Sequence, residues 1–322
     1  MNTISCRICL NKIKNKLIFP KEMMLGKLEK FDYMLCNNCG CLQICQVPKN
    51  LSEYYPSDYY SFDLVDENFL FKQPRKFFRD YKNNYSIFKK GLFGNFLNSV
   101  LSNSAYNFLS KVNLNKDSSI LDVGSGNGMF LHGLKSIGFN NVLGIDTFIK
   151  NNIKYKNNLE VLKKSIFQIN DKFDFIILNH SFEHMSDHSE VLKKISQLLN
   201  SKGVCIIRTP TVDSYSWKFY KENWVQLDAP RHLIIHSLKS FKLLLKKHNM
   251  KIYNYYNDST SFQFWGSEQY KNNIPLYSKK SYLFNPSKSI FKNADIQKFE
   301  KKAKILNKNK KGDQVVYYIM NR

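Results

Sequence analysis

Four cysteines near the N-terminus are spaced like metal ligands. They form two Cys-x-x-Cys pairs, which are Cys6 and Cys9, then Cys36 and Cys39. Two residues between thiolates let both sulfurs of a pair reach one tetrahedral Zn²⁺ at about 2.3 Å, and four such ligands close the site. We therefore predict a structural zinc centre. Cys41 and Cys45 lie close enough in the sequence to replace one of the four, but we expect them to stay free thiols.

A second stretch has the composition of a nucleotide site. Residues 120–130 read ILDVGSGNGMF, an apolar run that breaks into alternate glycines before a helix-like pattern. Glycines at these positions allow positive φ and let a ligand lie against bare main chain, while the amides that open the next helix suit an anionic group. Asp146 lies 24 positions after Asp122, near the offset of about 20 at which an acid holds a ribose in nucleotide-binding units. These features predict an adenosine ligand.

Two histidine-bearing segments have the chemistry for proton transfer. His184 follows an apolar run, and residues 224–237 form a polar and aromatic cluster with Pro230, His232 and His236. Histidine, whose ordinary pKa is about 6.5, suits proton transfer at neutral pH. We take His232 as the better candidate for chemistry and leave His236 open between a structural and a functional role.

The elements that must position these residues alternate in type. From Ser119 onward, short apolar runs alternate with amphipathic patterns, which predicts a mainly parallel sheet with helices on both faces. The expected strands cover residues 120–123, 141–146, 159–162, 173–178, 203–207, 250–256 and 314–320. Helices are expected at 128–137 and 189–199, and two or more helices within 69–112. Residues 33–44 predict a β-hairpin with the second cysteine pair at its tip.

The glycine loop, DVGSGNG, has strictly alternate glycines and an acid before the first, and it resembles motif I of the class I S-adenosylmethionine-dependent methyltransferases. Residues 173–185, FDFIILNHSFEHM, are similar to the fourth strand and following loop of that family, and residues 198–204, LLNSKGV, to its lead into strand five. The resemblance covers roughly residues 110–256. It implies an α/β protein with a Rossmann-like sheet of seven strands, the last of them antiparallel.

This resemblance implies S-adenosylmethionine as the cofactor and assigns residues to it. The implied cofactor residues are Asp122, Gly124, Gly126, Gly128, Asp146, Ser165, Ile166, Asn179 and His180. Asp146 would take the ribose hydroxyls, and Asn179 and His180 would lie under the sulfonium. Ser165 and Ile166 stand where the family often has an acid beside the adenine, so this chain departs from the pattern there.

An N-terminal cysteine module, a class I domain and a Pro-Arg-His segment together resemble bacterial sugar-modifying methyltransferases, including deoxysugar C-methyltransferases. That resemblance implies His232 as the base, His184 as its helper, and Tyr59 or Tyr60 at the sugar. The chain lacks the long C-terminal domain of the C-methyltransferases and has Arg231 where they carry an acid. We therefore expect O-methylation of a nucleotide-activated or surface-polysaccharide sugar, with Arg208 or Arg231 contacting its anionic groups.

The expected organisation has three parts. A zinc-binding module covers residues 1–60, a helical connector or lid covers 61–112, and the methyltransferase domain covers 113–322. The last contains an insertion rich in Lys and Asn over about 257–312.

Composition limits the alternatives. The 322 residues carry a formal net charge of +23, but lysines are spread along the chain, which favours a generally basic surface over a nucleic-acid partner. An RNA methyltransferase, a sugar C-methyltransferase and a non-catalytic cofactor-binding module stay as alternatives. No segment has the ~18 to 20 apolar residues of a membrane span, and 7 cysteines without an export signal indicate reduced thiols in a cytoplasmic protein. The sequence gives no oligomeric state.

Overall fold

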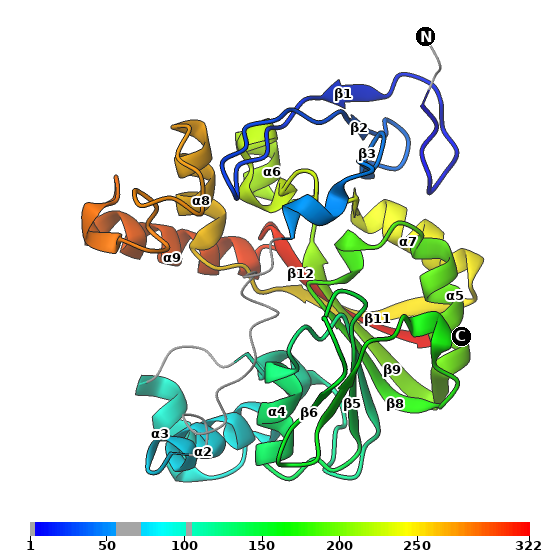
Figure 1. The fold of residues 1–322 in the computed structure, drawn as a ribbon, viewed down its shortest axis with the longest axis vertical. Helices are drawn as coiled ribbons and strands as arrows, with labels where there is room; N and C mark the ends of the chain where they lie inside the picture. Colours follow the sequence, from blue (N-terminus) through cyan, green and yellow to red (C-terminus); the bar gives the residue numbers. More distant parts are fainter. Residues whose placement is uncertain (1–3, 56–71, 101–104) are drawn as a thin grey trace. The chain divides into compact units, whose positions relative to one another are not determined.

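The computed structural model describes residues 4–55, 72–100 and 105–322. The chain divides into two compact units, drawn in Figure 1 and described separately here. Unit 1 comprises Met1–Pro56, His180–Lys193 and Ile207–Arg322, and unit 2 comprises Ser57–Asn179 and Lys194–Ile206. Strand β9 (Leu199–Pro210) and helix α5 (His188–Leu198) each contribute residues to both units.

Unit 2 contains a mainly parallel sheet with the strand order β9-β8-β4-β5-β7-β6. Its further strands are β4 (Ile120–Val123), β5 (Val142–Ile145), β6 (Ile153–Lys154), β7 (Glu160–Leu162) and β8 (Phe173–Asn179). β4 pairs in parallel with β5 and β8, and β5 pairs in parallel with β7. All four residues of β4 are buried, as a central parallel strand with both faces covered requires.

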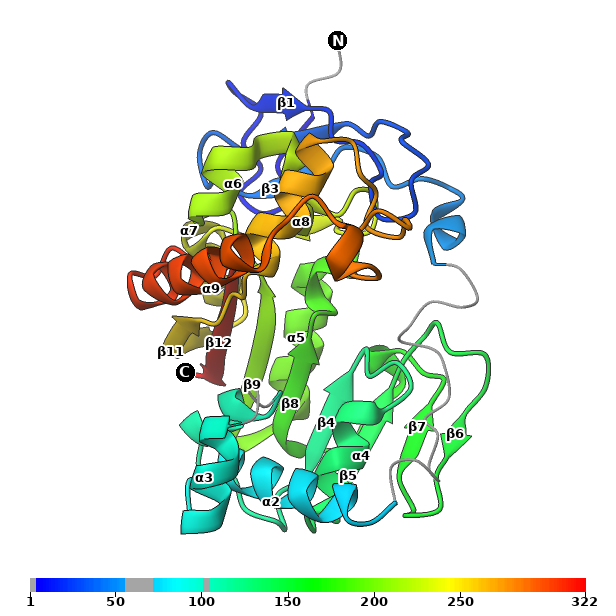
Figure 2. The same ribbon diagram turned by 90° about the vertical axis from the view of Figure 1, so that its left-hand side faces the viewer.

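Helices complete unit 2. They are α2 (Arg75–Phe88), α3 (Leu92–Val100), the 3-10 turns η2 (Asn107–Lys111) and η3 (Ile166–Gln168), and α4 (Met129–Ser136). α2 and α3 pack against each other (Figure 2). The prediction of two or more helices within 69–112 is thus confirmed. The short edge strand β6, which runs antiparallel to β7, is additional to the predicted strands.

In unit 1 the end of β9 lies beside β12 (Gln314–Asn321), and β12 lies beside β11 (Met250–Asn257). β11 and β12 are antiparallel, with Met250 opposite Asn321 and Tyr256 opposite Val316. This confirms the predicted antiparallel pair that completes a Rossmann-like methyltransferase sheet. Helix α7 (Leu238–Lys247) precedes β11, and the Ser237 side chain caps its N-terminus by accepting from the amide of Ser240.

The cysteine-bearing end of unit 1 has its own small antiparallel sheet, ordered β1-β2-β3-β10. Its strands are β1 (Lys16–Ile18), β2 (Tyr33–Leu35), β3 (Leu42–Ile44) and β10 (Ile234–Ile235). β2 and β3 form the predicted hairpin, and Gly40 takes a φ of 74° in the turn between them. The sequence did not predict that β10, nearly two hundred residues farther along the chain, would pair with β3.

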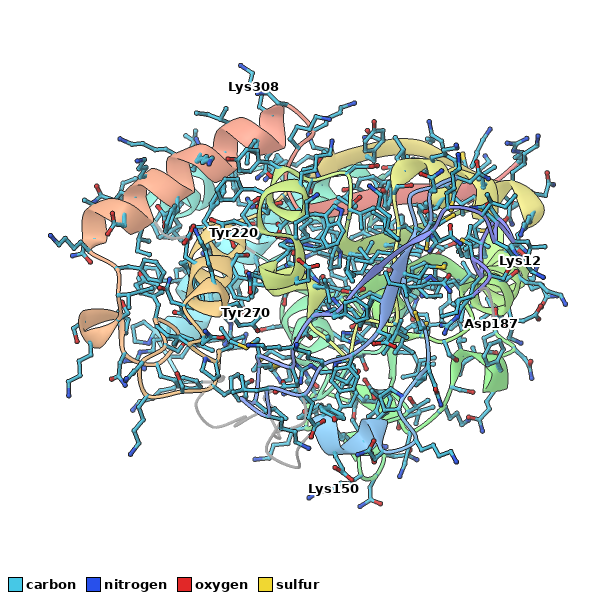
Figure 3. The ribbon with its side chains drawn as sticks, turned by 90° about the horizontal axis from the view of Figure 1, so that it is seen from above. Lys12, Lys150, Asp187, Tyr220, Tyr270 and Lys308 are labelled. Carbon is cyan, nitrogen blue, oxygen red and sulfur yellow. The ribbon has the colours of Figure 1, made fainter. Side chains whose placement is uncertain are left out.

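The remaining elements of unit 1 are mostly helical. They are η1 (Leu51–Tyr54), η4 (Phe182–His184), α6 (Tyr215–Tyr220), η5 (Lys221–Asn223), η6 (Val225–Leu227), α8 (Phe262–Lys271), η7 (Pro286–Lys288) and α9 (Asn293–Lys308). α8 and α9 show that the predicted insertion is folded. α8 packs on α6, where the Tyr220 hydroxyl donates to Glu268 at 2.8 Å. Figure 3 labels Tyr220 on α6 and Tyr270 on α8.

The surface carries dispersed lysines. Lys12, Lys150 and Lys308 are labelled in Figure 3, and all are exposed. Among the described helices, none combines the length and the apolar character that crossing a bilayer requires.

Candidate functional site

The loop after β4 in unit 2 has the backbone that the glycine pattern predicted. Gly124, Gly126 and Gly128 have φ values of 76°, 55° and 77°, a left-handed region that L side chains rarely adopt. A Cβ on Gly128 would lie 2.5 Å from Cγ2 of Val161. Helix α4 begins directly after this glycine. The loop is therefore a tight turn that only glycines allow.

Two carboxylates lie beside this loop. Asp146 directly follows β5, and its Oδ2 accepts from the amide of Gly126 at 2.9 Å while its Oδ1 accepts from the amide of Phe148 at 2.7 Å. Burial raises the pKa of Asp146. Burial and the nearby Asp146 also raise the pKa of Asp122 to about 7. Each oxygen of Asp146 keeps a lone pair for a further donor.

The rest of the loop fits a cofactor with hydroxyl and amino groups. Ser125 Oγ is buried, and within the described part of the chain it has no hydrogen-bond partner. Ser165 caps the 3-10 turn η3, in which Ile166 is 4% exposed, and Asn179 ends β8. Left-handed glycines, a buried carboxylate with free lone pairs and an unsatisfied hydroxyl therefore lie close together at this end of the sheet.

The four paired cysteines converge in unit 1. Cys6 Sγ lies 3.6 Å from Cys39 Sγ, and Cys9 Sγ lies 3.5 Å from Cys36 Sγ. All four sulfurs lie within 4.8 Å of one another. Tetrahedral zinc with bonds of 2.3 Å would place its sulfurs about 3.8 Å apart. The donor set therefore fits a zinc ion.

Neighbouring groups favour a thiolate at Cys6, whereas burial raises the pKa of Cys9 and the hydrogen bond to Cys6 raises the pKa of Cys39. The amide of Cys39 points at Cys36 Sγ at 3.5 Å. Hydrogen bonds from the thiols of Cys39 and Cys41 lower the pKa of Cys6. Cys41 Sγ itself is buried, lies 3.9 Å from the carbonyl of Leu42, and is not one of the four clustered sulfurs.

Unit 1 also brings together the two histidines predicted for catalysis. His184 lies on η4, and His232 follows the loop that ends η6. Their rings lie 4.6 Å apart at 70°. Glu183, beside His184 on η4, is fully buried between them and His180. The sequence analysis missed Glu183, although its position next to His184 in the motif was a signal.

The hydrogen bond of His232 defines its tautomer. Its Nδ1 lies 2.7 Å from the carbonyl of Gln226. Because a carbonyl only accepts, Nδ1 carries the proton and Nε2 keeps the lone pair. Nε2 faces Asp228 Oδ2 at 3.7 Å and Glu183 Oε1 at 3.9 Å. His232 therefore presents its Nε2 to two carboxylates.

His184 is held by two partners at one nitrogen. Its Nδ1 lies 3.0 Å from the carbonyl of Arg231 and 3.0 Å from the hydroxyl of Tyr55. Burial and the nearby His232 lower the pKa of His184 to about 4, so the ring is neutral at neutral pH. From the sequence, Tyr59 or Tyr60 was predicted to contact the sugar, and both lie outside the described residues. Tyr55, four residues before Tyr59, was not predicted from the sequence.

Arg231 corrects one prediction. Its side chain is 0% exposed, and its guanidinium donates to both oxygens of Asp228 and to the carbonyl of Tyr54. Glu22 lies 3.6 Å away. The prediction that Arg231 contacts an anionic substrate is wrong, because all its hydrogen bonds are turned inward. Arg208 pairs with Asp258 at 2.7 Å.

His236 belongs to the core. Its Nε2 lies 2.8 Å from His188 Nδ1, and its Nδ1 lies 2.9 Å from Ser240 Oγ. Burial lowers the pKa of His236 to about 3. The role that the sequence left open is therefore structural.

Comparisons with known proteins bear on this arrangement. Residues 96–255 match a family model described as "Methyltransferase domain". No curated protein matches the chain.

Solved structures of several methyltransferases and a synthase are similar in part. The cyclopropane synthase MmaA2 of Mycobacterium tuberculosis is 16% identical, with a TM-score of 0.42 over 65% of this chain and 80% of that one. An O-methyltransferase from a trans-AT PKS multienzyme of Brevibacillus brevis, in complex with S-adenosyl-L-homocysteine, is 13% identical, with a TM-score of 0.40 over 66% and 69%. With TM-scores below 0.5, these likenesses carry no argument about function.

The family match covers the glycine loop, Asp146, Glu183 and both candidate catalytic histidines. Residues 96–255 therefore carry a methyltransferase domain.

Proposed function

We propose that this protein transfers a methyl group from S-adenosylmethionine to a hydroxyl of a sugar, either nucleotide-activated or part of a surface polysaccharide. The assignment as a methyltransferase rests on the family match. The choice of a sugar as substrate rests on the resemblance of the cysteine pairs and the Pro-Arg-His segment to sugar-modifying methyltransferases. The observation that carries the chemistry is the hydrogen bond from His232 Nδ1 to a carbonyl, which leaves Nε2 as the nitrogen that can accept a proton. A hydroxyl acceptor needs such a base.

The cofactor supplies an electrophilic methyl group when it is bound. We assign its binding to the loop after β4, with Asp146 accepting hydrogen bonds from the ribose hydroxyls. The complete proposed set is Asp122, Gly124, Gly126, Gly128, Asp146, Ser165, Ile166, Asn179 and His180. Asp146 supports this because its Oδ2 accepts from an amide of the glycine loop and both of its oxygens keep lone pairs for further donors.

His232 takes the proton of the acceptor hydroxyl at Nε2. Its Nδ1–H stays on the carbonyl of Gln226 throughout, which fixes the ring so that Nε2 alone is available. His184 stays neutral and, with Tyr55, forms the polar wall beside His232. Tyr59 stays a proposed sugar contact from the sequence.

The four clustered cysteines bind a structural zinc ion in this proposal. Four protein ligands leave no open position for substrate, so the ion holds the fold of the module and takes no part in the transfer.

One incubation series tests the function. The protein is mixed with S-adenosylmethionine and, separately, with nucleotide sugars, cell-surface glycans and RNA, and each product is searched for a methyl mass increment. A methylated sugar whose NMR spectrum places the methyl on oxygen supports the proposal. A methyl on carbon would favour the C-methyltransferase, and methylation of RNA alone would favour the RNA enzyme.

Two matched substitutions connect the result to the residues. His232→Gln removes the base and should reduce transfer by at least about a hundredfold, the lower range of general-base effects. His248→Gln changes a histidine whose ring bonds Ser189 away from the cluster and should leave the rate unchanged. Equal rates of methyl transfer in the two variants would show that His232 is not the base.

A further inference from the structure

Glu183 is a buried carboxylate with one poorly satisfied oxygen. Its side chain is 0% exposed. Oε2 accepts from the hydroxyl of Thr209 at 3.0 Å, whereas Oε1 has no well-formed hydrogen bond among the described residues. A buried charged oxygen without a partner costs free energy unless positive charge lies close by. Glu183 therefore needs a cationic neighbour.

Histidines are the groups placed to provide that charge. Glu183 Oε1 lies 3.5 Å from His180 Nδ1 and 3.9 Å from His232 Nε2. Among the described residues, no lysine or arginine forms an ion pair with Glu183. The other carboxylate facing His232, Asp228, is already paired with Arg231 through both of its oxygens. Glu183 is thus the carboxylate that depends on the neighbouring histidines for a positive partner.

Glu183 is ionised at neutral pH. Burial opposes its charge, but the adjacent His180 and the positive charge available on His232 outweigh burial and lower the pKa of Glu183 to about 2. The titratable and charged groups that surround Glu183 and His232 are Tyr33, Tyr55, His180, His184, His188, Asp228 and Arg231.

We propose that Glu183 is a positioning residue that strengthens His232 as the base of methyl transfer. The proposal rests on the proposed function. As the acceptor oxygen bonds to the methyl group, the methyl–sulfur bond of S-adenosylmethionine breaks and its electron pair goes to sulfur. The hydroxyl proton passes to Nε2 of His232, and the O–H electron pair stays on the oxygen. The imidazolium that forms then lies beside the unpaired charge of Glu183, which stabilises it.

The pH profile of kcat/KM distinguishes this role from a structural one. Glu183→Gln keeps the shape and removes the charge. We expect its acidic limb to move down by about one pH unit and its plateau to fall about tenfold, with unchanged cofactor affinity. Glu183→Asp should recover part of the plateau. Glu190→Gln, the same change at an exposed position on α5, should leave the profile unchanged.

A direct titration gives a second readout that needs no acceptor. NMR of the histidine ring protons, with the His232 signal assigned from His232→Gln, should show a midpoint at lower pH in Glu183→Gln than in the unsubstituted protein. An unmoved midpoint overturns the proposal even if sugars are methylated. If no sugar is methylated but the midpoint moves, the proposed function fails and the coupling of Glu183 to His232 stands.

The competing possibility is a metal ion at this cluster, since ligand atoms of Glu183, His184 and His232 lie within 4.8 Å of one another. Elemental analysis of the protein after incubation with Zn²⁺ or Mn²⁺ decides between a metal ion at this cluster and the proposed role of Glu183. One metal per chain, lost on substituting Cys36, supports the proposal. A second metal that is lost in Glu183→Gln overturns it.

Discussion

The hydroxyl of Tyr33, on strand β2, donates to the backbone carbonyl of His232 at 2.8 Å. β10 begins two residues later and pairs with β3 of the same sheet. On the far side of β10, Ser237 Oγ donates to the carbonyl of Cys39 in the cysteine cluster. The segment that carries the proposed base is therefore held on both sides by the cysteine-bearing hairpin.

This attachment predicts that the cysteine cluster controls catalysis without contacting substrate. Cys36→Ser should remove one zinc equivalent per chain and reduce methyl transfer by at least tenfold, because the hairpin that anchors His232 loses its metal support. Cofactor binding should persist, since all its proposed residues except His180 belong to unit 2. Elemental analysis, transfer rates and calorimetric titration with S-adenosylmethionine measure the three quantities.

Cys45→Ser is the matched control in the same module, because Cys45 lies outside the four-sulfur cluster. It should retain the metal and the rate. Loss of the metal in Cys45→Ser, with retention in Cys36→Ser, would show that the ligand set is different.

Tyr55 offers a sharper test of the histidine cluster. Tyr55→Phe removes the hydroxyl 3.0 Å from His184 Nδ1 but keeps the ring packed edge-on against that histidine. We expect kcat to fall about twofold to tenfold, the effect of one hydrogen bond worth about 0.5–1.5 kcal/mol. Steady-state kinetics of Tyr55→Phe and Tyr59→Phe side by side compare the tyrosine that the structure places with the one that the sequence suggested. A larger loss in Tyr59→Phe would reverse the assignment.

The sequence predicted those features that depend on local pattern. The strands β4, β5, β7, β8, β9, β11 and β12 coincide with predicted apolar runs, and the hairpin β2–β3 follows the cysteine spacing and Gly40. Alternate glycines permit the left-handed backbone that a tight turn needs, so the loop after β4 was also predictable. These features need only neighbouring residues.

Features that join distant segments could not be read from the sequence. β10 has only two residues and no strand signal of its own, so its pairing with β3 depends on tertiary contacts. Arg231 was predicted to contact substrate because its sequence neighbours do not show whether its side chain is buried. Its partners Glu22 and the Tyr54 carbonyl lie far away in the sequence.

Arg231 leads to a prediction about stability. Arg231→Met would leave the largely buried Asp228, whose side chain is 16% exposed, without its cation, and breaking a buried ion pair costs about 3–5 kcal/mol. Urea unfolding should show a loss of this size in the free energy of unfolding. Lys193→Gln, which breaks the exposed pair with Glu190, should change it by less than about 0.5 kcal/mol. Comparable small losses in both would mean that Arg231 is not buried as described.

Asp146 should control cofactor affinity. Asp146→Asn keeps the shape of the side chain but removes the charge that accepts from the Gly126 amide and, by our proposal, from the ribose. We expect the Kd for S-adenosylmethionine to rise about tenfold to a hundredfold, since hydrogen bonds to charged groups are worth about 1.5–3 kcal/mol. Calorimetric titration measures it. Asp117→Asn, at an exposed position of the same unit, should keep the original Kd.

Asp122 predicts a pH-dependent stability in the cofactor-free protein. Burial and the nearby Asp146 raise its pKa from 3.8 to about 7, so the folded state binds this proton more tightly than the unfolded state does. The resulting stabilisation is present below about pH 4 and is lost as the pH rises through about 7. A shift of about three units corresponds to roughly 4 kcal/mol at most.

Asp122→Asn carries no charge at any pH and should escape this loss. Relative to the unsubstituted protein, the variant should gain a few kcal/mol in the free energy of unfolding on going from pH 5 to pH 8, as measured in urea. Asp117→Asn should show no such gain, because its carboxylate is exposed. If the difference between Asp122→Asn and the unsubstituted protein stayed constant across this range, Asp122 would already be ionised in the folded state at pH 5, and the charge of Asp146 would have to be compensated by another group.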